Sequence, residues 1–509
     1  MKNYRQMKIK ILYLFMILGI VSACSDDFMD TSNPNQISDG SFWSSKSDAE
    51  YALTGCYDVL QSKPMYGGGV YNSGIRDHDC LSDNSYNVWE WMGLEPIADG
   101  TTDPTHWFLQ GFWESAYKGI ARCNNVIANV PTIESMSEDE INTILGEAKF
   151  LRALFYFNLA NGFGEVPLIL EPQTVETASI AKSTVREIYD AMIVDLTFAA
   201  DKLGTADFGH ADQGAALSLL AKVYLYDGKF TEAEATAKQV IDLGTYTLFS
   251  DYNTLFTPAN EVNSEVVFSV RFESGLADNN GEAFSGTWAK VAQTHHQPMP
   301  NFVDDFYCID GLPIDQSPLY DANDNKLNRD PRLDVSVIFP GEVWIEGGNP
   351  LAKKKVKTGY AMHKYIRNTT EYLSDGPQDF YVIRYADVLL MRAEALIESN
   401  QISQEIYDLI NEVRARVNMP RIEDVEGAGL SQAELRNILR HERRVEFGLE
   451  GTRYYDLKRW GTLEEATVRA NADNIVNHFM AFEGDRTLYW PLPQVEVDNN
   501  KLLDQNPNW

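Results

Sequence analysis

The spacing of hydrophobic residues predicts amphipathic helices in the first half of the chain. Across residues 147–161, apolar side chains recur at steps of three and four positions, and Gly162 and Gly164 then end the pattern. A further helix is expected from Ser183, a residue type suited to an N-cap, to about Leu203. These patterns predict a mainly α fold.

A pair of antiparallel helices is predicted over residues 215–243. Gly228 breaks the pattern between the two helices. The small residues Ala221 and Ala233 would let the helices approach closely, and Tyr224 would fill the gap between them. These positions fall where a tetratricopeptide repeat has its small, aromatic and Gly residues. The apolar positions are Leu217, Ala221 and Tyr224 on the first helix, and Phe230, Ala233, Ala237 and Val240 on the second.

The same layout recurs in residues 384–400 and 404–417, beyond a long stretch that does not repeat. That stretch, about 246–381, is rich in Gly, Pro, Asn and Asp and holds short strand-like runs such as 266–271. Residues 65–115 have a similar irregular composition. We therefore expect tetratricopeptide-like helix pairs forming a scaffold, with large loop-rich inserts forming the ligand-binding face.

Composition and charge narrow the possible functions. The 509 residues include 43 Lys plus Arg against 74 Asp plus Glu, a formal net charge of −31. With 44% hydrophobic and 23% charged residues, the chain can build a packed core, and general disorder is excluded. An acidic surface repels phosphate backbones, and no basic stripe offsets it, so nucleic acid is excluded as a partner.

The N-terminal segment has the pattern of an export signal. Four basic residues precede an uninterrupted apolar run at residues 11–21, which suits the core of a signal peptide. That run is shorter than the roughly 20 residues that a bilayer-spanning helix needs, and no later run is long enough. Residues 21–24, Val-Ser-Ala-Cys, resemble a bacterial lipobox, in which Cys24 is acylated and becomes the mature N-terminus.

We predict a lipoprotein signal peptide at residues 1–23, a lipid anchor and tether at 24–47, and a single domain at 48–509. The acidic pair at residues 26–27 resembles the surface-export signal of Bacteroidota lipoproteins. Plain secretion with an incidental Cys24 is the alternative.

The remaining cysteines show neither CxxC pairs nor the His spacing of a zinc site. They are too sparse for a disulfide framework and are predicted to be buried small hydrophobic residues. They are Cys56, Cys80, Cys123 and Cys308.

Several motifs, in this order and behind a lipobox, resemble the SusD/RagB family of surface nutrient-binding lipoproteins. The resemblance covers essentially the whole predicted mature chain. The motifs are KFLRALFYFNLANGFGEVPL at 149–168, NRDPRL at 328–333, IRYADVLLMRAEALIE at 383–398, ERRVEFGLEGTRYYDLKRWG at 442–461, and LYWPLPQVEVDNNKLLDQNPNW at 488–509.

The resemblance implies a protein on the outer face of the outer membrane, anchored by its N-terminal lipid. Such proteins cover a SusC-like TonB-dependent transporter and capture oligosaccharides for import, and some relatives capture peptides instead. The predicted partners are therefore that transporter, an oligosaccharide or polysaccharide ligand, and the outer membrane. No cofactor is predicted. In residues 442–461, charged and apolar residues alternate, which predicts a buried ion-pair network, because charged groups near a core need partners.

Aromatic residues in the irregular segments are the candidate ligand contacts. Trp89 and Trp91 lie two positions apart, so an extended segment would place both rings on one side. Flat rings cover the apolar faces of sugars, while charged and amide side chains fix their orientation. Packing roles are the alternative for each residue, and we expect Trp107 and Trp113 to pack against a helix at 116–130. The predicted ligand-binding residues are Arg76, Asp79, Asp83, Asn84, Trp89, Trp91, Trp288, Tyr307 and Trp344.

No catalytic or metal site is predicted. Asp321 and its neighbours lack the Gly and terminal Glu of a calcium loop and are interpreted as a polar turn. His295 and His296 have no HExxH context, and no nucleophile elbow or phosphate-binding loop occurs. The basic cluster at 353–355 is interpreted as a solvated loop. The alternative is that it contacts an acidic group of the ligand.

The sequence therefore predicts non-catalytic capture of a glycan and its delivery to the transporter. The acidic charge favours a neutral glycan unless a local patch offsets it. A peptide-capturing relative, a surface glycoside hydrolase and a scaffold that binds only proteins are the alternatives.

Overall fold

A computed structural model describes residues 42–68, 73–89, 93–206, 208–275, 281–285, 295–343, 347–367 and 375–509. The predicted signal peptide, Cys24 and most of the tether lie outside these residues. The chain is mainly α with a few short strands, which confirms the predicted fold class. Among the described residues, no helix combines the length and apolar character needed to cross a bilayer.

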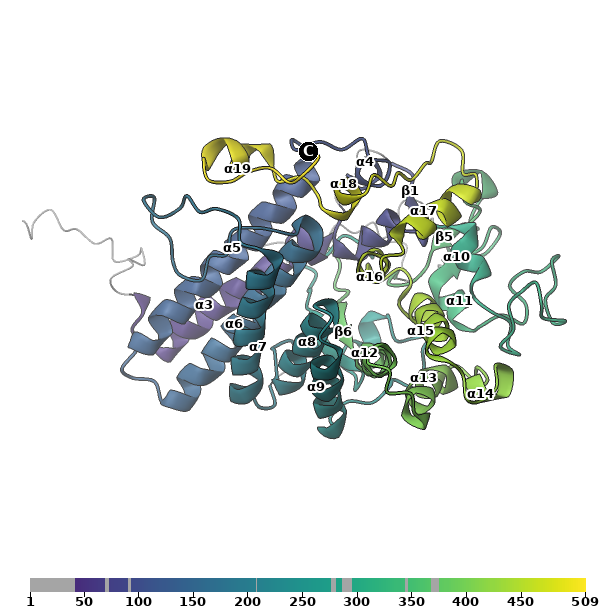
Figure 1. Cartoon of the computed structure of the whole chain (residues 1–509), viewed down its shortest axis with the longest axis horizontal. Helices are drawn as coiled ribbons and strands as arrows, with labels where there is room; N and C mark the ends of the chain where they lie inside the picture. The colour runs from purple at the N-terminus through teal and green to yellow at the C-terminus, as the bar shows by residue number, and fades with distance from the viewer. Residues whose placement is uncertain are drawn as a thin grey trace, which may run out of the picture.

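The first half of the chain forms a layer of long helices, which Figure 1 shows lying side by side. α5 packs against α3 and α6, and α7 covers the other side of α6. α6 begins well before the predicted residue 147, because Ser137 and Glu140 form a capping box on a polar first turn without apolar periodicity. Thr184, rather than the predicted Ser183, caps α7. The helices are α3 (Lys46–Leu60), α5 (Trp107–Asn129), α6 (Glu138–Phe163) and α7 (Val185–Lys202).

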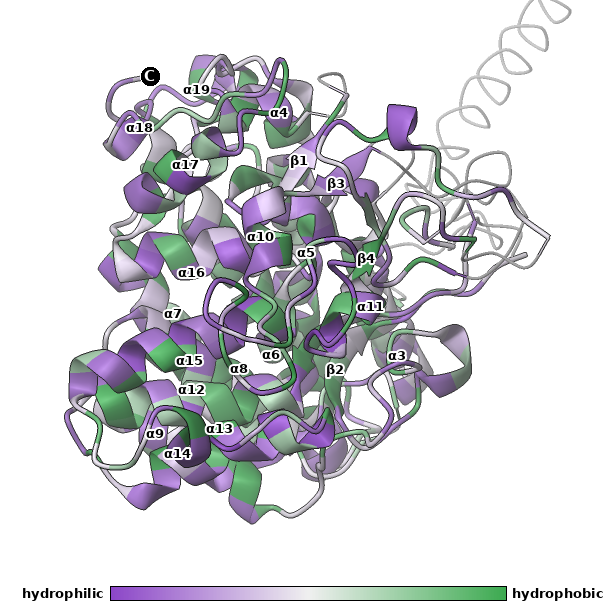
Figure 2. Cartoon of the chain, turned by 90° about the vertical axis from the view of Figure 1, so that its right-hand side faces the viewer, coloured by the Kyte–Doolittle hydropathy of each residue, from purple (hydrophilic) through white to green (hydrophobic). Residues whose placement is uncertain are grey.

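α5 also begins earlier than expected. Trp107 and Trp113 belong to the helix itself, whereas they were predicted to precede it. Trp113 is buried, and Trp107 is 41% exposed with its ring stacked on that of His106. Hydrophobic and hydrophilic residues alternate around many of the helices in Figure 2, as expected for elements that bury one side.

The two predicted helix pairs form and lie next to each other. α8 (Gln213–Tyr226) packs on α9 (Phe230–Asp242), and α9 in turn packs on α12 (Tyr385–Glu398), the partner of α13 (Gln404–Arg416). Ala221 and Ala233 are fully or almost fully buried, as expected of small residues at a close helix contact. The helical scaffold is therefore continuous in space although the sequence between the pairs is long. The tetratricopeptide-like detail remains a prediction.

The inserted segment contributes short antiparallel strands that return the chain to the scaffold. β2 (Val266–Val270), predicted as a strand-like run, pairs with β6 (Phe380–Arg384), which leads directly into α12. β4 (Val337–Ile338) pairs with β5 (Ala361–Met362). β1 (Ser85–Asn87) pairs with β3 (His296–Pro298), from a segment far away in sequence.

Shorter elements complete the described chain. They are η2 (Lys63–Gly67), η3 (Ile75–Leu81), α4 (Glu95–Ala98), η5 (Val130–Thr132), η6 (Pro258–Asn260), α10 (Pro300–Asp304), α11 (Arg332–Ser336), η7 (Lys353–Lys355), α14 (Ile422–Val425), α15 (Gln432–Phe447), α16 (Arg453–Trp460), α17 (Leu463–Ala472), α18 (Asp485–Leu488) and α19 (Gln494–Asn499).

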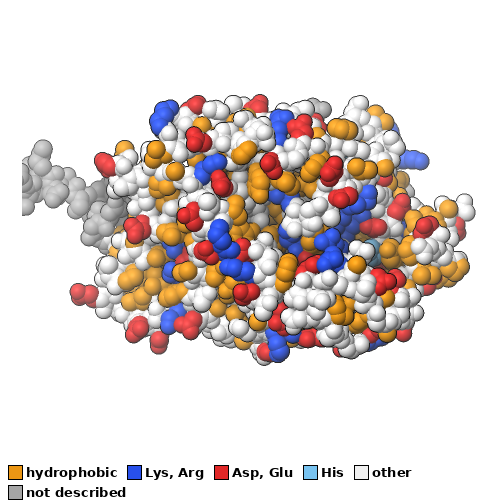
Figure 3. Space-filling view, viewed as in Figure 1, with side chains coloured by type: hydrophobic (Ala, Val, Ile, Leu, Met, Phe, Trp, Pro, Cys, Tyr) orange, Lys and Arg blue, Asp and Glu red, His pale blue; other side chains and the backbone are white. Residues whose placement is uncertain are grey.

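The cysteines and the surface charge follow the sequence predictions. Cys56, Cys80, Cys123 and Cys308 are free thiols with at most 1% exposure, which confirms their interpretation as buried hydrophobic residues. Figure 3 shows many Asp and Glu side chains spread over one face of the molecule, in keeping with the net charge of −31.

A buried ion-pair network centred on α15 confirms the interpretation of residues 442–461. Glu446 is fully buried and contacts Arg332, Arg384 and Arg416 at 2.5–3.1 Å. Burial by itself would raise the pKa of Glu446, but the three guanidinium groups outweigh it and hold that pKa far below its ordinary value. The network joins the insert to the scaffold, because Arg332 comes from α11 and Arg384 from the end of β6.

Candidate functional site

The β1–β3 pairing brings together two segments that the sequence separates widely. Asn87 pairs with His296, and the amide of Val88 donates to the carbonyl oxygen of His295 at 2.9 Å. The indole of Trp89 then stacks on the imidazole of His295, with ring centroids 5.6 Å apart and planes inclined by 17°. The half-buried Trp89 and the buried His295 thus form one aromatic unit at the end of the strands.

The imidazole of His295 is uncharged near neutral pH. Burial, with the positive potential of the neighbouring His296, lowers the pKa of His295 well below its ordinary value. A neutral ring stacked on an indole leaves the unit apolar, which suits the C–H face of a sugar.

A third segment packs against the same strands. The side-chain oxygen of Gln297 in β3 accepts the backbone amides of Lys357 and Thr358 at 2.7 and 3.2 Å. The ammonium of Lys357 donates to the hydroxyl of Tyr86 in β1 at 2.9 Å. Both irregular regions in which sequence patterns predict ligand contacts therefore meet at these strands, the second of them through two segments. Trp91, Trp288 and Trp344, the remaining predicted Trp contacts, lie outside the described residues.

Four predicted ligand residues are instead buried inside the protein. Arg76 donates to the Asp77 carboxylate at 2.8 Å and to the carbonyl oxygen of Phe284 at 2.7 Å. Asp79 accepts the amides of Leu449 and Arg453 at 2.5 and 3.1 Å. Exposed fractions are 3% for Arg76, 1% for Asp79, and zero for Asp83 and Asn84.

Asp83 and Asn84 bind the C-terminal helices. Asp83 contacts Arg444, Arg453 and Arg469 at 2.8–3.2 Å, and the side-chain oxygen of Asn84 accepts from Arg444 at 2.9 Å. Burial alone would raise the pKa of Asp83, but these guanidinium groups hold it far below its ordinary value. Because all four side chains are directed into the protein, we assign Arg76, Asp79, Asp83 and Asn84 a structural role in place of the predicted ligand contacts.

Tyr307 lies in a different hollow. Its ring stacks on that of His441, with centroids 4.0 Å apart and planes inclined by 24°. The pocket has a volume of about 310 Å³ and is lined mainly by residues of α14, α15 and the loop between them, with none from β1 or β3. Burial raises the pKa of Tyr307 to about 12, so its hydroxyl stays protonated. Trp89 and Tyr307 therefore lie at two different places on the molecule, and no sequence pattern singled out His441.

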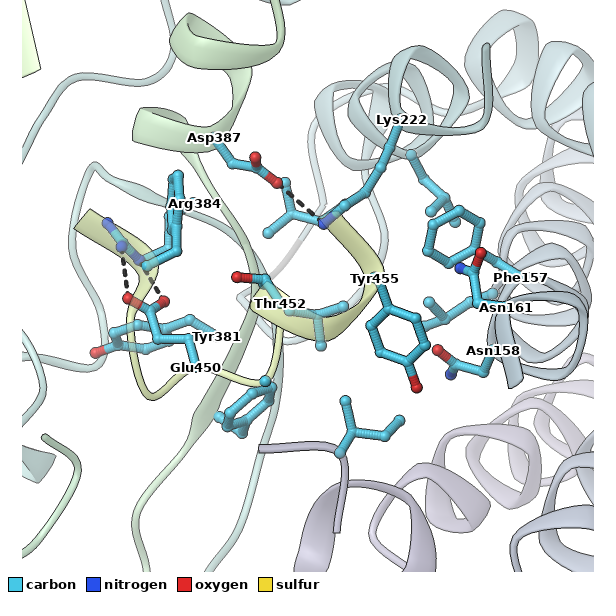
Figure 4. A pocket seen from close by; sticks show the side chains of 18 of the residues that line it. Phe157, Asn158, Asn161, Lys222, Tyr381, Arg384, Asp387, Glu450, Thr452 and Tyr455 are labelled. Carbon is cyan, nitrogen blue, oxygen red and sulfur yellow. Dashed lines mark hydrogen bonds and ion pairs between the residues drawn. The ribbon is translucent and has the colours of Figure 1, made fainter. Parts of the chain in front are cut away.

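An interior cavity lies where α6 and α8 meet β6 and residues 447–455, and Figure 4 shows it from close by. Lys222 points toward Asp387 at 3.0 Å, and Arg384 binds Glu450 at 2.7 Å. The cavity volume is about 60 Å³, whereas ligand pockets have about 300–1,000 Å³. This cavity holds room for water molecules and is too small for an oligosaccharide.

The described residues offer no metal centre. No cluster of three His, Cys, Asp or Glu side chains among them could hold a metal ion. Asp321 accepts the amide of Asn323 at 2.9 Å, which confirms its interpretation as a polar turn.

Comparison with known proteins identifies the class to which this helical scaffold with aromatic loop sites belongs. The model of the SusD family matches residues 263–509, and the model described as starch-binding associating with outer membrane matches residues 27–225. The chain belongs to the SusD family, as its sequence motifs predicted.

Individual relatives resemble the chain over nearly its whole length. SusD-like protein P2 of Formosa agariphila is 27% identical over 99% of this chain and 100% of that protein. A crystal structure of a SusD-like carbohydrate-binding protein from Bacteroides fragilis has a TM-score of 0.79 at 27% identity, covering 91% of this chain and 100% of that one. A laminarin-binding SusD-like protein has a TM-score of 0.73 at 26% identity, covering 92% and 100%.

Proposed function

We propose that this protein captures an oligosaccharide at the cell surface through Trp89 and the segments that meet at β1 and β3. The stacked pair of Trp89 and His295 is the observation that carries the proposal, because it presents an apolar aromatic unit beside polar loops. The carbohydrate-binding and laminarin-binding relatives support the same ligand class. Trp91, Trp288 and Trp344 are proposed as further contacts, and Tyr307 as the aromatic residue of a second site.

Binding of glycans to the Trp89→Ala variant tests this site. Native affinity electrophoresis of the full protein in detergent, in gels containing laminarin or starch, measures retardation by each neutral glycan. Removing the ring should weaken binding about tenfold, equivalent to about 1.4 kcal/mol. Tyr51→Ala, which removes a ring that is 70% exposed on α3, is the matched control and should bind normally.

Other outcomes separate the alternatives. Retardation that survives in Trp89→Ala but is lost in Tyr307→Ala would move the site to the pocket with His441. Binding of peptides without any glycan would favour the peptide-capturing alternative. Release of shortened glycan products would contradict the proposed non-catalytic role and favour a hydrolase.

We also propose that the protein is held at the outer membrane by acylation of Cys24 and faces the cell exterior. The lipobox-like sequence supports this anchor, and the family description associates such proteins with the outer membrane. Mass spectrometry of the membrane-extracted chain should show the lipid on Cys24. A Cys24→Ala variant that stays in the membrane fraction would contradict the proposal.

Delivery to a SusC-like TonB-dependent transporter completes the proposed role. A tether keeps a captured ligand at high effective concentration near its transporter. Purification of the tagged protein in mild detergent should retain a TonB-dependent transporter in fixed ratio. Its absence from crosslinked membranes would argue against this partner.

A further inference from the structure

Two exposed lysines without a partner among the described residues line one pocket of this acidic protein. Most Lys and Arg side chains bind a carboxylate or a carbonyl oxygen, as Lys222 and Arg384 do. Lys63 and Lys118 are exposed, and neither ammonium has an ion pair or hydrogen bond to any residue that the structure describes. Both line the same pocket, which has a volume of about 280 Å³.

Helix packing is what places these lysines together. α5 packs against η2, where an added Cβ on Gly111 would lie 3.1 Å from Cγ of Pro64. Ser115 and Lys118 follow Gly111 by one and two helical turns, so they share the face of α5 that meets η2. Lys63 is the first residue of η2. The fold therefore places two positive charges at one pocket. A bound anion would offset the repulsion between them.

The rest of the pocket also suits an anionic group. The hydroxyl oxygen of Ser62 is buried without a hydrogen-bond partner among the described residues. Glycines line part of the pocket, and the backbone is closely packed there, since a Cβ added to Gly68 would lie 3.1 Å from Cβ of Phe284. Asp58, the one carboxylate among the described residues of the lining, already binds Arg122 at 2.8 Å. Ammonium and hydroxyl donors of this kind bind carboxylate or sulfate oxygens.

A larger cleft continues from this pocket. Asp58 and Gln61 line both, and the cleft has a volume of about 570 Å³. The guanidinium of Arg271 lies 4.7 Å from the ring centroid of Phe208. The guanidinium of Arg271 forms an ion pair with the fully buried carboxylate of Asp379 at 3.0 Å. The backbone carbonyl oxygen of Arg271 accepts a hydrogen bond from the side-chain amide of Gln61 at 2.6 Å. Phe208 and Arg271 line this cleft together with polar residues that include the carboxylates of Asp58 and Glu273, and its volume is in the range of ligand pockets.

We infer that the cleft and the pocket form one groove that binds an acidic oligosaccharide, separate from the Trp89 site. A uronate carboxylate or a sulfate ester would contact Lys63 and Lys118, and neighbouring sugar rings would lie against Phe208 and Arg271. The net charge of −31 does not prevent this, because salt screens distant charges beyond about 8–10 Å while contacts at the lysines persist. The inference rests on the proposed function only for the carbohydrate class.

Calorimetric titration of the full protein tests the groove. Polygalacturonate is the uronate probe, carrageenan the sulfate probe, and laminarin the neutral reference. The double variant Lys63→Ala/Lys118→Ala should bind the acidic polymer about tenfold more weakly, while its affinity for laminarin stays unchanged. Lys238→Ala/Lys501→Ala removes the same charge from exposed lysines that line neither the pocket nor the cleft, and should retain full affinity.

The controls distinguish this inference from the proposed function. Trp89→Ala should lose laminarin and keep the acidic polymer, whatever the lysine variants do. The inference is wrong if neither acidic polymer binds, or if the two double variants lose affinity equally. Equal loss would show that the effect comes from overall charge rather than from the groove.

Discussion

At the scale of single residues, the position of Lys458 makes its side chain lose its proton more easily than an exposed lysine does. Its ammonium donates to the carbonyl oxygen of Asn161 at 2.5 Å and lies over the rings of Tyr454 and Tyr489 at 5.1 and 5.3 Å. It has no carboxylate partner among the described residues. Burial of the ammonium lowers the pKa of Lys458 to about 7. The charge therefore opposes folding at acidic and neutral pH.

Replacing Lys458 should change how stability depends on pH. The folded pKa lies below the ordinary value of about 10.4, so the unfolded chain binds more protons between pH 7 and 10, and stability rises with pH in that window. Lys458→Met should lack this rise, so its advantage over the wild type should be largest at pH 6 and shrink toward pH 10. Urea unfolding across this range measures it.

Lys238→Met is the control for this prediction, because Lys238 is exposed and pairs with Asp242 on the surface of α9. The same pH-dependent advantage in that variant would contradict the role assigned to Lys458.

At the scale of elements, the C-terminal segment fixes the ends of α5 and α6. Trp490 is buried among Phe108, Phe112 and Phe163, and its amide donates to the carbonyl oxygen of Gly162 at 3.0 Å. The Asn506 amide donates to the carbonyl oxygens of Phe163 and Trp490 at 2.7 and 2.8 Å. The proline-containing end of the chain thus closes over the helices, as Figure 1 shows near α19.

Gly162→Ala should disturb this closure. An added Cβ would lie 2.7 Å from Cε3 and Cζ3 of Trp490, and the buried indole has little room to move. We expect a net loss of about 1–3 kcal/mol in the free energy of unfolding, even though Ala favours a helix over Gly by about 1 kcal/mol. Thermal and urea unfolding would measure the change.

Gly204→Ala provides the comparison, because nothing lies within 4 Å of its added Cβ. It should be neutral or slightly stabilising. A Gly162→Ala variant as stable as Gly204→Ala would mean that Trp490 is not tightly packed against Gly162.

At the scale of the whole molecule, buried ion pairs hold the insert, the scaffold and the C-terminal helices together. Arg384 alone joins three carboxylates, with Glu265 at 2.6 Å, Glu446 at 3.0 Å and Glu450 at 2.7 Å. All four side chains are almost completely buried. Such a network adds specificity to the assembly, because every misplaced segment would leave a charge without a partner.

Arg384→Met should therefore be strongly destabilising. Removing one partner of a buried pair costs about 3–5 kcal/mol, since carboxylates remain buried without full compensation. Arg421→Met removes an exposed guanidinium, with 55% of its side chain accessible, and should cost less than about 1 kcal/mol. Urea unfolding of both variants at pH 7 compares the two, and equal losses would contradict the central role of Arg384.

For the proposed site, residue types suggested candidate contacts in the sequence, but residue types do not reveal which of those side chains are buried. Polar residues close to Trp89 in the sequence have the composition of a sugar site. Asp83 and Asn84, however, bind arginines from helices near the other end of the chain. Trp89 was predicted as an aromatic contact, but its stacking partner His295 was not. The pairing of β1 with β3, which a local pattern does not encode, brings them together.

By itself, the sequence predicted the mainly α class, the two helix pairs, the irregular insert, the family and the presence of a buried ion-pair network. Each depends on patterns within a few turns of chain, where periodicity and residue chemistry suffice. The tertiary structure alone decided which carboxylate meets which arginine, that Tyr307 stacks on His441, and that Lys63 and Lys118 share a pocket. Those contacts join residues far apart in sequence, so they are set by how the elements pack and not by any local pattern.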